Sequence, residues 1–150
     1  MHSSRPATAI HVLSLLALEP EQVVTSDWIA GSVGTHAVVV RRLLGRLRKA
    51  GLVEVLPGPK GGARLARAAA EIRLAEIYRA VEDEGLLALH RHPNPACPVG
   101  GRIEDVLIGF FARAEQALVA DLERSTLAEY YQRCFGKELP ASSGKGGKLH

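Results

Sequence analysis

The spacing of apolar residues along the first 50 positions predicts three helices joined by short turns. The helices are expected over residues 6–18, 25–34 and 36–50. Thr25 has a side chain suited to an N-cap, and Gly51 is typical of the residue that ends a helix. The order of helix, short helix, glycine-containing corner and longer helix is that of a helix-turn-helix.

Shorter apolar runs after these helices predict a β-hairpin. Two strands are expected over 52–56 and 63–65, with a glycine-rich loop over 58–62 between them. A further short strand is expected over 72–74, before a helix over 75–84. A hairpin that follows a helix-turn-helix in this way is a wing.

The longest helical pattern lies in the second half of the chain. It is expected over 103–124, and a short helix over 126–134 follows it. An apolar stripe repeats along the long helix at Ile103, Leu107, Phe110, Ala114 and Ala117. One small domain cannot cover this stripe, so we expect a second subunit to pack against it.

Composition narrows the fold class. Hydrophobic residues make up 47% of the 150 residues, which is enough for a core, whereas aromatic residues make up only 5%. The core must therefore consist mainly of leucine, valine, alanine and isoleucine. Such a core is more typical of packed helices than of a β-sandwich. The fold expected is therefore mainly α, a winged helix-turn-helix with a small β-hairpin wing and a long C-terminal dimerisation helix.

Positive charge is concentrated in the first 67 residues. This part has 9 Lys and Arg against 4 Asp and Glu, a net charge of +5, whereas the rest has 10 against 12, a net charge of −2. A local basic surface attracts polyanions whatever the remainder of the molecule carries. Because the excess coincides with the predicted winged helix-turn-helix, we expect double-stranded DNA as the partner.

The predicted third helix and the wing hold the side chains expected to contact DNA. Four residues at the start of the helix are placed to reach base edges in a major groove, namely Thr35, His36, Val38 and Arg41. Three further cations on the same helix are placed to contact phosphates, namely Arg42, Arg46 and Lys49. In the wing, Lys60 and Arg64 supply cations for a minor groove or a phosphate, while the glycines of 58–62 let the loop turn tightly.

These features predict four parts along the chain. They are a winged helix-turn-helix DNA-binding domain over 1–84, a loop region over 85–102, dimerisation helices over 103–134 and a disordered tail over 135–150. The predicted function is that of a sequence-specific DNA-binding transcription regulator. The alternative is a winged-helix module that binds protein, and the cations on the third helix and the wing favour DNA.

Other classes of function find no support in the sequence. No nucleophile with its base and no paired carboxylates are recognisable, and the run 58–62 lacks the Gly-Lys-Ser/Thr ending of a phosphate loop, so we expect no enzyme. No segment approaches the roughly 18 apolar residues of a membrane span, and the N-terminus lacks the pattern of a signal peptide. We therefore expect a cytoplasmic protein without membrane contact.

Several stretches resemble the Rrf2 family of bacterial winged-helix transcription regulators. They are LRKAGLV at 47–53, GPKGG at 58–62, LAR at 65–67, IRL at 72–74, YRAVE at 78–82 and CPVG at 97–100. With the long helix that follows, the resemblance covers nearly the whole chain up to the tail. It implies a homodimer with crossed long helices that binds a palindromic operator, usually as a repressor.

The cysteines depart from one pattern of this family. Several members hold an iron–sulfur cluster on three closely spaced cysteines before the dimerisation helix, whereas the loop here has Cys97 alone, and Cys134 lies 37 positions later. The resemblance is therefore to the cluster-free branch, and we expect no cofactor and no metal. His90, His92 and Cys97 nevertheless have the donor atoms of a weak metal site.

Two residues have both a structural and a functional interpretation. Cys97 is either a thiol sensor between the wing domain and the dimerisation helix, or a small hydrophobic side chain buried for packing, which we favour. The signal expected for the regulator is either a redox change or a small molecule. Trp28 either packs in the helix-turn-helix core, which we favour, or contacts phosphate through its indole N–H.

Overall fold

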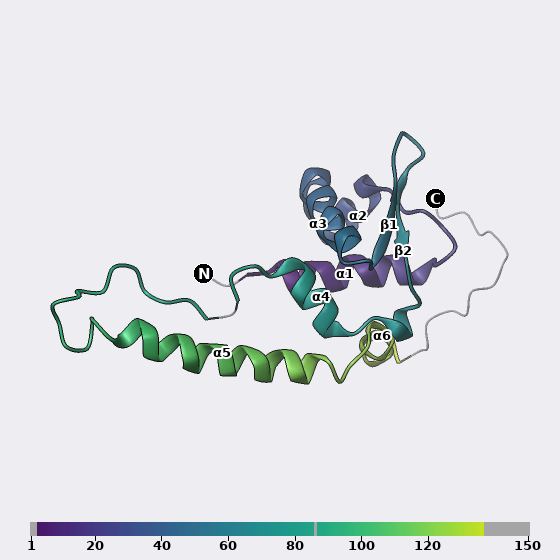
Figure 1. The fold of residues 1–150 in the computed structure, drawn as a ribbon. Helices are drawn as coiled ribbons and strands as arrows, with labels where there is room; N and C mark the ends of the chain where they lie inside the picture. The colour runs from purple at the N-terminus through teal and green to yellow at the C-terminus, as the bar shows by residue number, and fades with distance from the viewer. Residues whose placement is uncertain (1–2, 86, 137–150) are drawn as a thin grey trace.

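The computed structural model describes residues 3–85 and 87–136 of the chain. Its elements follow in the order α1 (Arg5–Leu18), α2 (Ser26–Val33), α3 (Ala37–Lys49), β1 (Val53–Leu56), β2 (Gly62–Leu65), the short 3-10 helix η1 (Ala69–Glu71), α4 (Leu74–Val81), α5 (Ile103–Leu122) and α6 (Leu127–Phe135). Figure 1 shows α3 and the hairpin on one side of the molecule and α5 along the opposite side. The predicted fold class, mainly helical with one two-stranded hairpin, is confirmed.

The helix-turn-helix formed by α2 and α3 has the caps that the sequence predicts. The Thr25 side-chain oxygen accepts a hydrogen bond of 3.2 Å from the backbone N–H of Trp28, and Gly34 ends α2 with a φ of 79°. The inward face of α3 lies in the hydrophobic core and consists of Val40, Leu43, Leu44 and Leu47. Because this face is held in the core, the opposite face of α3 is free for other contacts.

The wing is an antiparallel pair of β1 and β2 in which Glu54 lies opposite Arg64. Val24, between α1 and α2, adds one bridge to β2. Its N–H and carbonyl each form a hydrogen bond of 2.8 Å with Ala63. The wing is therefore anchored by its base to the segment that leads into the helix-turn-helix.

The strand predicted over 72–74 is wrong. Arg73 forms only an isolated bridge with Thr126, and Leu74 is the first residue of α4. Only Ile72 and Arg73 have extended backbone angles, and they join η1 to α4. Their backbone pairs with the turn before α6, where Leu74 N–H donates to the Ser125 carbonyl at 2.9 Å.

The ends of two other predicted segments are corrected. The helix predicted over 75–84 ends at Val81, because Glu82 has extended backbone angles of φ −103° and ψ 114°. Phe135 is the last residue of α6, so it does not belong to the tail predicted over 135–150. The remainder of that prediction, from residue 137 onward, lies outside the described residues.

α6 packs on the winged domain. Leu127 is fully buried in the same core as α1 and α3, and Tyr131 is buried beside it. Thr126 and Glu129 form a capping box, in which the threonine oxygen accepts from the Glu129 N–H at 3.1 Å and the Glu129 carboxylate accepts from the Thr126 N–H at 3.4 Å. The C-terminal part of the chain is thus fixed to the domain that carries the wing.

α5 is fixed to α4 along one side only. The Tyr78 hydroxyl donates a hydrogen bond to Glu115, and Arg79 forms an ion pair of 3.2 Å with Glu123. Burial, together with the Glu115 carboxylate, raises the pKa of Tyr78. No residue of α5 is buried within the single chain, so its outer side stays exposed. No helix among the described residues is long and apolar enough to cross a membrane.

Candidate nucleic-acid interface

The start of α3 presents most of the predicted base-reading side chains to the outside. His36 is the N-cap residue and is exposed, and its imidazole forms no cap hydrogen bond. Val38 is 53% exposed, and Arg41 one turn later is also exposed. Thr35 differs, because it lies half-buried in the turn before the helix. His36, Val38 and Arg41 are therefore all exposed at the start of α3.

The predicted phosphate contacts separate into two groups. Arg42, Lys49 and Lys60 are exposed and form no ion pair with any described residue. By contrast, the Arg46 guanidinium lies 2.6 Å from the Asp83 carboxylate and donates to the Val81 carbonyl at 3.3 Å. A free phosphate contact was predicted for Arg46, whereas the structure ties it to the segment after α4.

Arg64 in the wing also forms an ion pair within the protein. Its Nε lies 2.7 Å from the Glu54 carboxylate across the hairpin. Opposite charges on directly paired strand residues stabilise the pairing modestly. Lys60 at the loop is therefore the wing cation that is free to meet a polyanion.

Two glycines of the wing loop are required by close backbone approach. A Cβ at Gly61 would overlap the Leu56 carbonyl, and a Cβ at Gly62 would overlap the Val24 carbonyl. Gly58 has a φ of 94°, which favours glycine for conformational reasons. The predicted tight turn is present, and it places Lys60 at the wing tip beside these glycines.

The structure departs from the sequence-based expectation at two further side chains. Arg5, in the first turn of α1, forms an ion pair of 3.2 Å with Asp83. The two residues are 78 positions apart in the sequence, so no local pattern predicts this contact. Trp28 is 38% exposed, so the favoured prediction of core packing is corrected. α2 is only two turns long, and Ile29 and Ala30 already fill its buried side.

Cys97 is exposed, which contradicts the favoured prediction of a buried packing residue. It lies in a turn in which Gly101 N–H donates to the Cys97 carbonyl at 2.8 Å. Hydrogen bonds from the backbone N–H groups of Gly100 and Val99 lower the pKa of the Cys97 thiol. Exposure and a stabilised thiolate are the properties of a reactive cysteine.

We expect Cys97 to react with iodoacetamide at a lower pH in the folded protein than in the unfolded chain. A lowered thiol pKa means that the thiolate persists to lower pH when the turn is formed and loses this advantage when the turn is lost. The rate would be followed against pH in a Cys134→Ser background, with and without urea. Coinciding pH profiles would show that the turn does not stabilise the thiolate.

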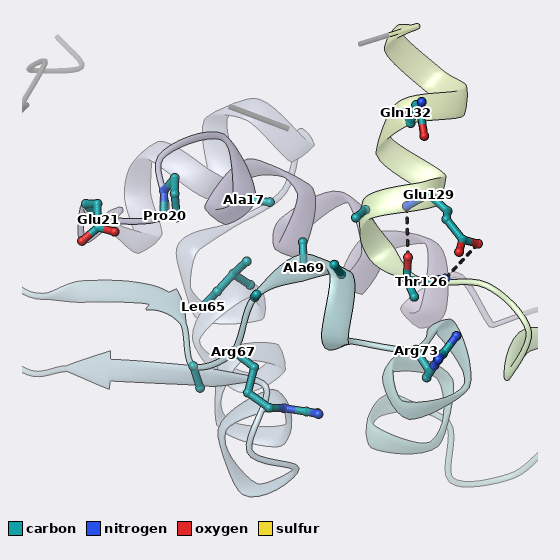
Figure 2. A pocket seen from close by; sticks show the side chains of 14 residues that line it. Ala17, Pro20, Glu21, Leu65, Arg67, Ala69, Arg73, Thr126, Glu129 and Gln132 are labelled. Atoms are coloured by element: carbon teal, nitrogen blue, oxygen red, sulfur yellow. Dashed lines mark hydrogen bonds between the residues drawn. The ribbon is translucent and has the colours of Figure 1, made fainter. Parts of the chain in front are cut away.

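A hollow of about 820 Å³ lies between the end of α1, the base of the wing and α6. Figure 2 shows Leu65 and Ala69 on one side of it and Glu129 and Gln132 of α6 on another. Alanine side chains form much of its wall, while Arg67 forms an ion pair of 2.7 Å with Glu76. The volume is within the range of small-molecule pockets, so a small-molecule signal would have room here.

Comparison with known proteins gives a consistent result. The family model of the Rrf2 family, described as iron-dependent transcriptional regulators, matches residues 2–133. YwnA of Bacillus subtilis (strain 168), named as an HTH-type transcriptional regulator, is 40% identical over 136 residues, which cover 90% of this chain and 100% of YwnA. NsrR of Shouchella clausii, an HTH-type transcriptional regulator, is 30% identical over 76% of this chain and 82% of NsrR. The solved structure of T. potens IscR has the same fold, with a TM-score of 0.65 at 22% identity, over 97% of this chain and 93% of IscR.

The iron dependence in the family description does not fit the donor side chains of this chain. No group of three or more His, Cys, Asp or Glu side chains in the described part of the chain is arranged to hold a metal ion. The chain has two cysteines in all, and Cys97 precedes α5 whereas Cys134 lies on α6. An iron–sulfur cluster generally needs about four ligands, mainly thiolates.

The family of the chain follows from its winged fold and from the match along nearly the whole sequence. The family model covers far more than half of the chain, and YwnA is similar along its full length. The chain belongs to the Rrf2 family of DNA-binding helix-turn-helix transcription regulators.

Proposed function

We propose that this chain is a homodimeric, sequence-specific repressor that binds a palindromic operator. The observation that carries the proposal is the placement of α3 and the wing on one side of the domain, with α5 on the other (Figure 1). Two copies that join through α5 leave both DNA-binding sides free. Such a regulator acts on the chromosome, so we expect it in the cytoplasm.

The start of α3 is the element that reads sequence in this proposal. Placed end-first in a major groove, it brings His36, Val38 and Arg41 to the base edges. The Arg41 guanidinium suits a guanine, because it donates two hydrogen bonds in the geometry of O6 and N7. Val38 supplies an apolar contact of the kind that a thymine methyl accepts.

Phosphate contacts hold this helix in place. Arg42 and Lys49 are exposed along α3, and Lys60 is exposed on the wing loop. Cations of this kind fix position without reading sequence. The wing reaches the duplex beside the groove that α3 fills, where Lys60 meets a phosphate or enters the minor groove.

Dimerisation uses the outer side of α5. Val106 and Phe110 are each 55% exposed there, and Ala114 and Ala117 continue the stripe. Ile103 and Leu107, the first residues of the predicted stripe, are half-buried within the single chain. A symmetric pair of such helices buries the same residues in both subunits and matches a palindromic site.

Selection from a pool of random duplexes tests this proposal. We expect the enriched sequences to contain an inverted repeat, with half-site centres about 10 base pairs apart or a multiple of that distance. The selection would use the full chain, with sequencing of the bound fraction after each round. Enrichment of a single, unrepeated half-site would contradict the dimer, and no enrichment would contradict specific DNA recognition.

A further inference from the structure

A hollow of about 450 Å³ separates the start of α1 from one side of α3. Three arginines line it, Arg5 from α1 and Arg42 and Arg46 from α3, together with the hydroxyl-bearing side chains of Thr8 and Thr35. Guanidinium and hydroxyl groups are the donors that commonly bind phosphate oxygens in proteins. The hollow lies beside α3, on the side where α1 begins.

One carboxylate of the protein holds two of these arginines. The Asp83 carboxylate lies 2.6 Å from Arg46 and 3.2 Å from Arg5, through the same oxygen. The hydrogen bond from Arg46 lowers the pKa of Asp83, so the carboxylate is ionised at neutral pH. Arg42, the third arginine, has no acidic partner among the described residues.

The Asp83 carboxylate is exposed enough for another anionic group to replace it on the two arginines. The Asp83 side chain is 58% exposed, and the two arginines are about 40% exposed. Exposed ion pairs contribute little to stability, so the densely charged backbone of DNA can replace the carboxylate at small cost. Asp83 also lies two residues after the end of α4, at the start of the segment that leads to α5.

We propose that Asp83 occupies the place of a DNA phosphate in the free protein, and that the operator backbone displaces it to bind Arg5, Arg42 and Arg46. This inference rests on the proposed DNA binding and adds to it a phosphate site with an internal competitor. DNA binding then frees Asp83 and releases the start of the α4–α5 segment from α1 and α3. A signal that holds Asp83 on its arginines lowers the affinity for DNA.

The test compares Asp83→Asn with Glu84→Gln. Both changes remove one negative charge from neighbouring exposed positions, but Glu84 forms no ion pair with a described residue. We expect Asp83→Asn to bind a duplex roughly fivefold more tightly than wild type at low salt, and Glu84→Gln to stay within about twofold. The logarithmic salt slope of Asp83→Asn should be steeper by about two, one for each subunit of the dimer.

A double-mutant cycle separates competition from helix positioning. Under competition, Arg5→Ala weakens DNA binding more in Asp83→Asn than in wild type, because the arginine is then free for phosphate. If Asp83 instead serves only to position α3 through Arg46, Asp83→Asn weakens binding, and the proposal is overturned. Thermal unfolding of each variant confirms that the comparison is made between folded proteins.

A further experiment distinguishes the phosphates of the DNA backbone from free inorganic phosphate as the ligand of the hollow. Replacing chloride with inorganic phosphate at equal ionic strength should leave the affinity for DNA within about twofold. A selective loss of binding would assign the hollow to the free ion and contradict the proposal. Wild type that fails to bind any duplex refutes the proposed function itself, whereas equal affinities of Asp83→Asn and Glu84→Gln refute only the role of Asp83.

Discussion

Phe110→Asp is expected to convert the dimer into a monomer and to lower the affinity for the operator by on the order of 100-fold or more. Phe110 is 55% exposed on the outer side of α5, in the middle of the stripe that runs from Val106 to Ala117. Burying a phenylalanine side chain stabilises an interface by about 2 kcal/mol, and a symmetric dimer buries it twice. A carboxylate at the same place must be desolvated in both subunits, which opposes association even with the Arg113 guanidinium nearby, 4.6 Å from the centroid of the Phe110 ring.

The loss of DNA binding follows from the loss of the dimer. A dimer holds its two recognition helices together, so the second half-site is bound at a high effective concentration. A monomer keeps the same contacts within one half-site but loses this advantage. The fold of the single chain should survive, because Phe110 packs against no buried core residue.

Ala112→Asp is the matched control. It introduces the same carboxylate at an exposed position of α5, but two residues along a helix turn the side chain by about 200° from the stripe. We expect it to remain dimeric and to bind DNA with an affinity close to wild type. Sedimentation velocity and fluorescence anisotropy measure the two properties, and a Phe110→Asp variant that remains a dimer would place the interface elsewhere.

Local sequence signals were sufficient for most of the fold. Thr25 and Thr126 stand at N-caps, and Gly34 and Gly51 take the positive φ that ends a helix. The apolar face of α3 is the buried one, as its spacing predicts. Caps and periodicity depend on residues a few positions apart, so a single sequence contains them.

Contacts between distant positions were not predictable in the same way. Arg46 was expected to be free, but its partner Asp83 lies on the segment after α4, and Arg5 reaches the same carboxylate from α1. The Glu54–Arg64 pair becomes visible only when the register of the hairpin is known. Which cations remain free for DNA is therefore decided by tertiary packing.

Burial of single side chains was also mispredicted where an element is short. α2 has room for only a narrow buried face, so Trp28 is left partly outside. Cys97 is exposed because its loop folds into a turn of its own rather than against the core. Tryptophan and cysteine are residue types that favour burial, but in both cases the local backbone does not direct the side chain into the core.

Binding of the dimer to DNA is expected to be steeply salt-dependent. Four predicted contacts per subunit are exposed cations without an ion pair to a described residue, namely Arg41, Arg42, Lys49 and Lys60. These eight cations of the dimer, with Arg41 at a base edge among them, displace roughly seven counterions from the DNA, and the slope of log K against log salt is about −7. The affinity should fall by about four orders of magnitude between 50 and 200 mM salt.

The most direct test of the account is this salt titration of the wild-type protein on its selected operator. Fluorescence anisotropy across 50 to 200 mM potassium chloride gives the slope. A value of about −7 is the predicted result, and it requires that both copies of the cationic surface formed by α3 and the wing meet the duplex. A slope near zero would show that this surface does not contact DNA.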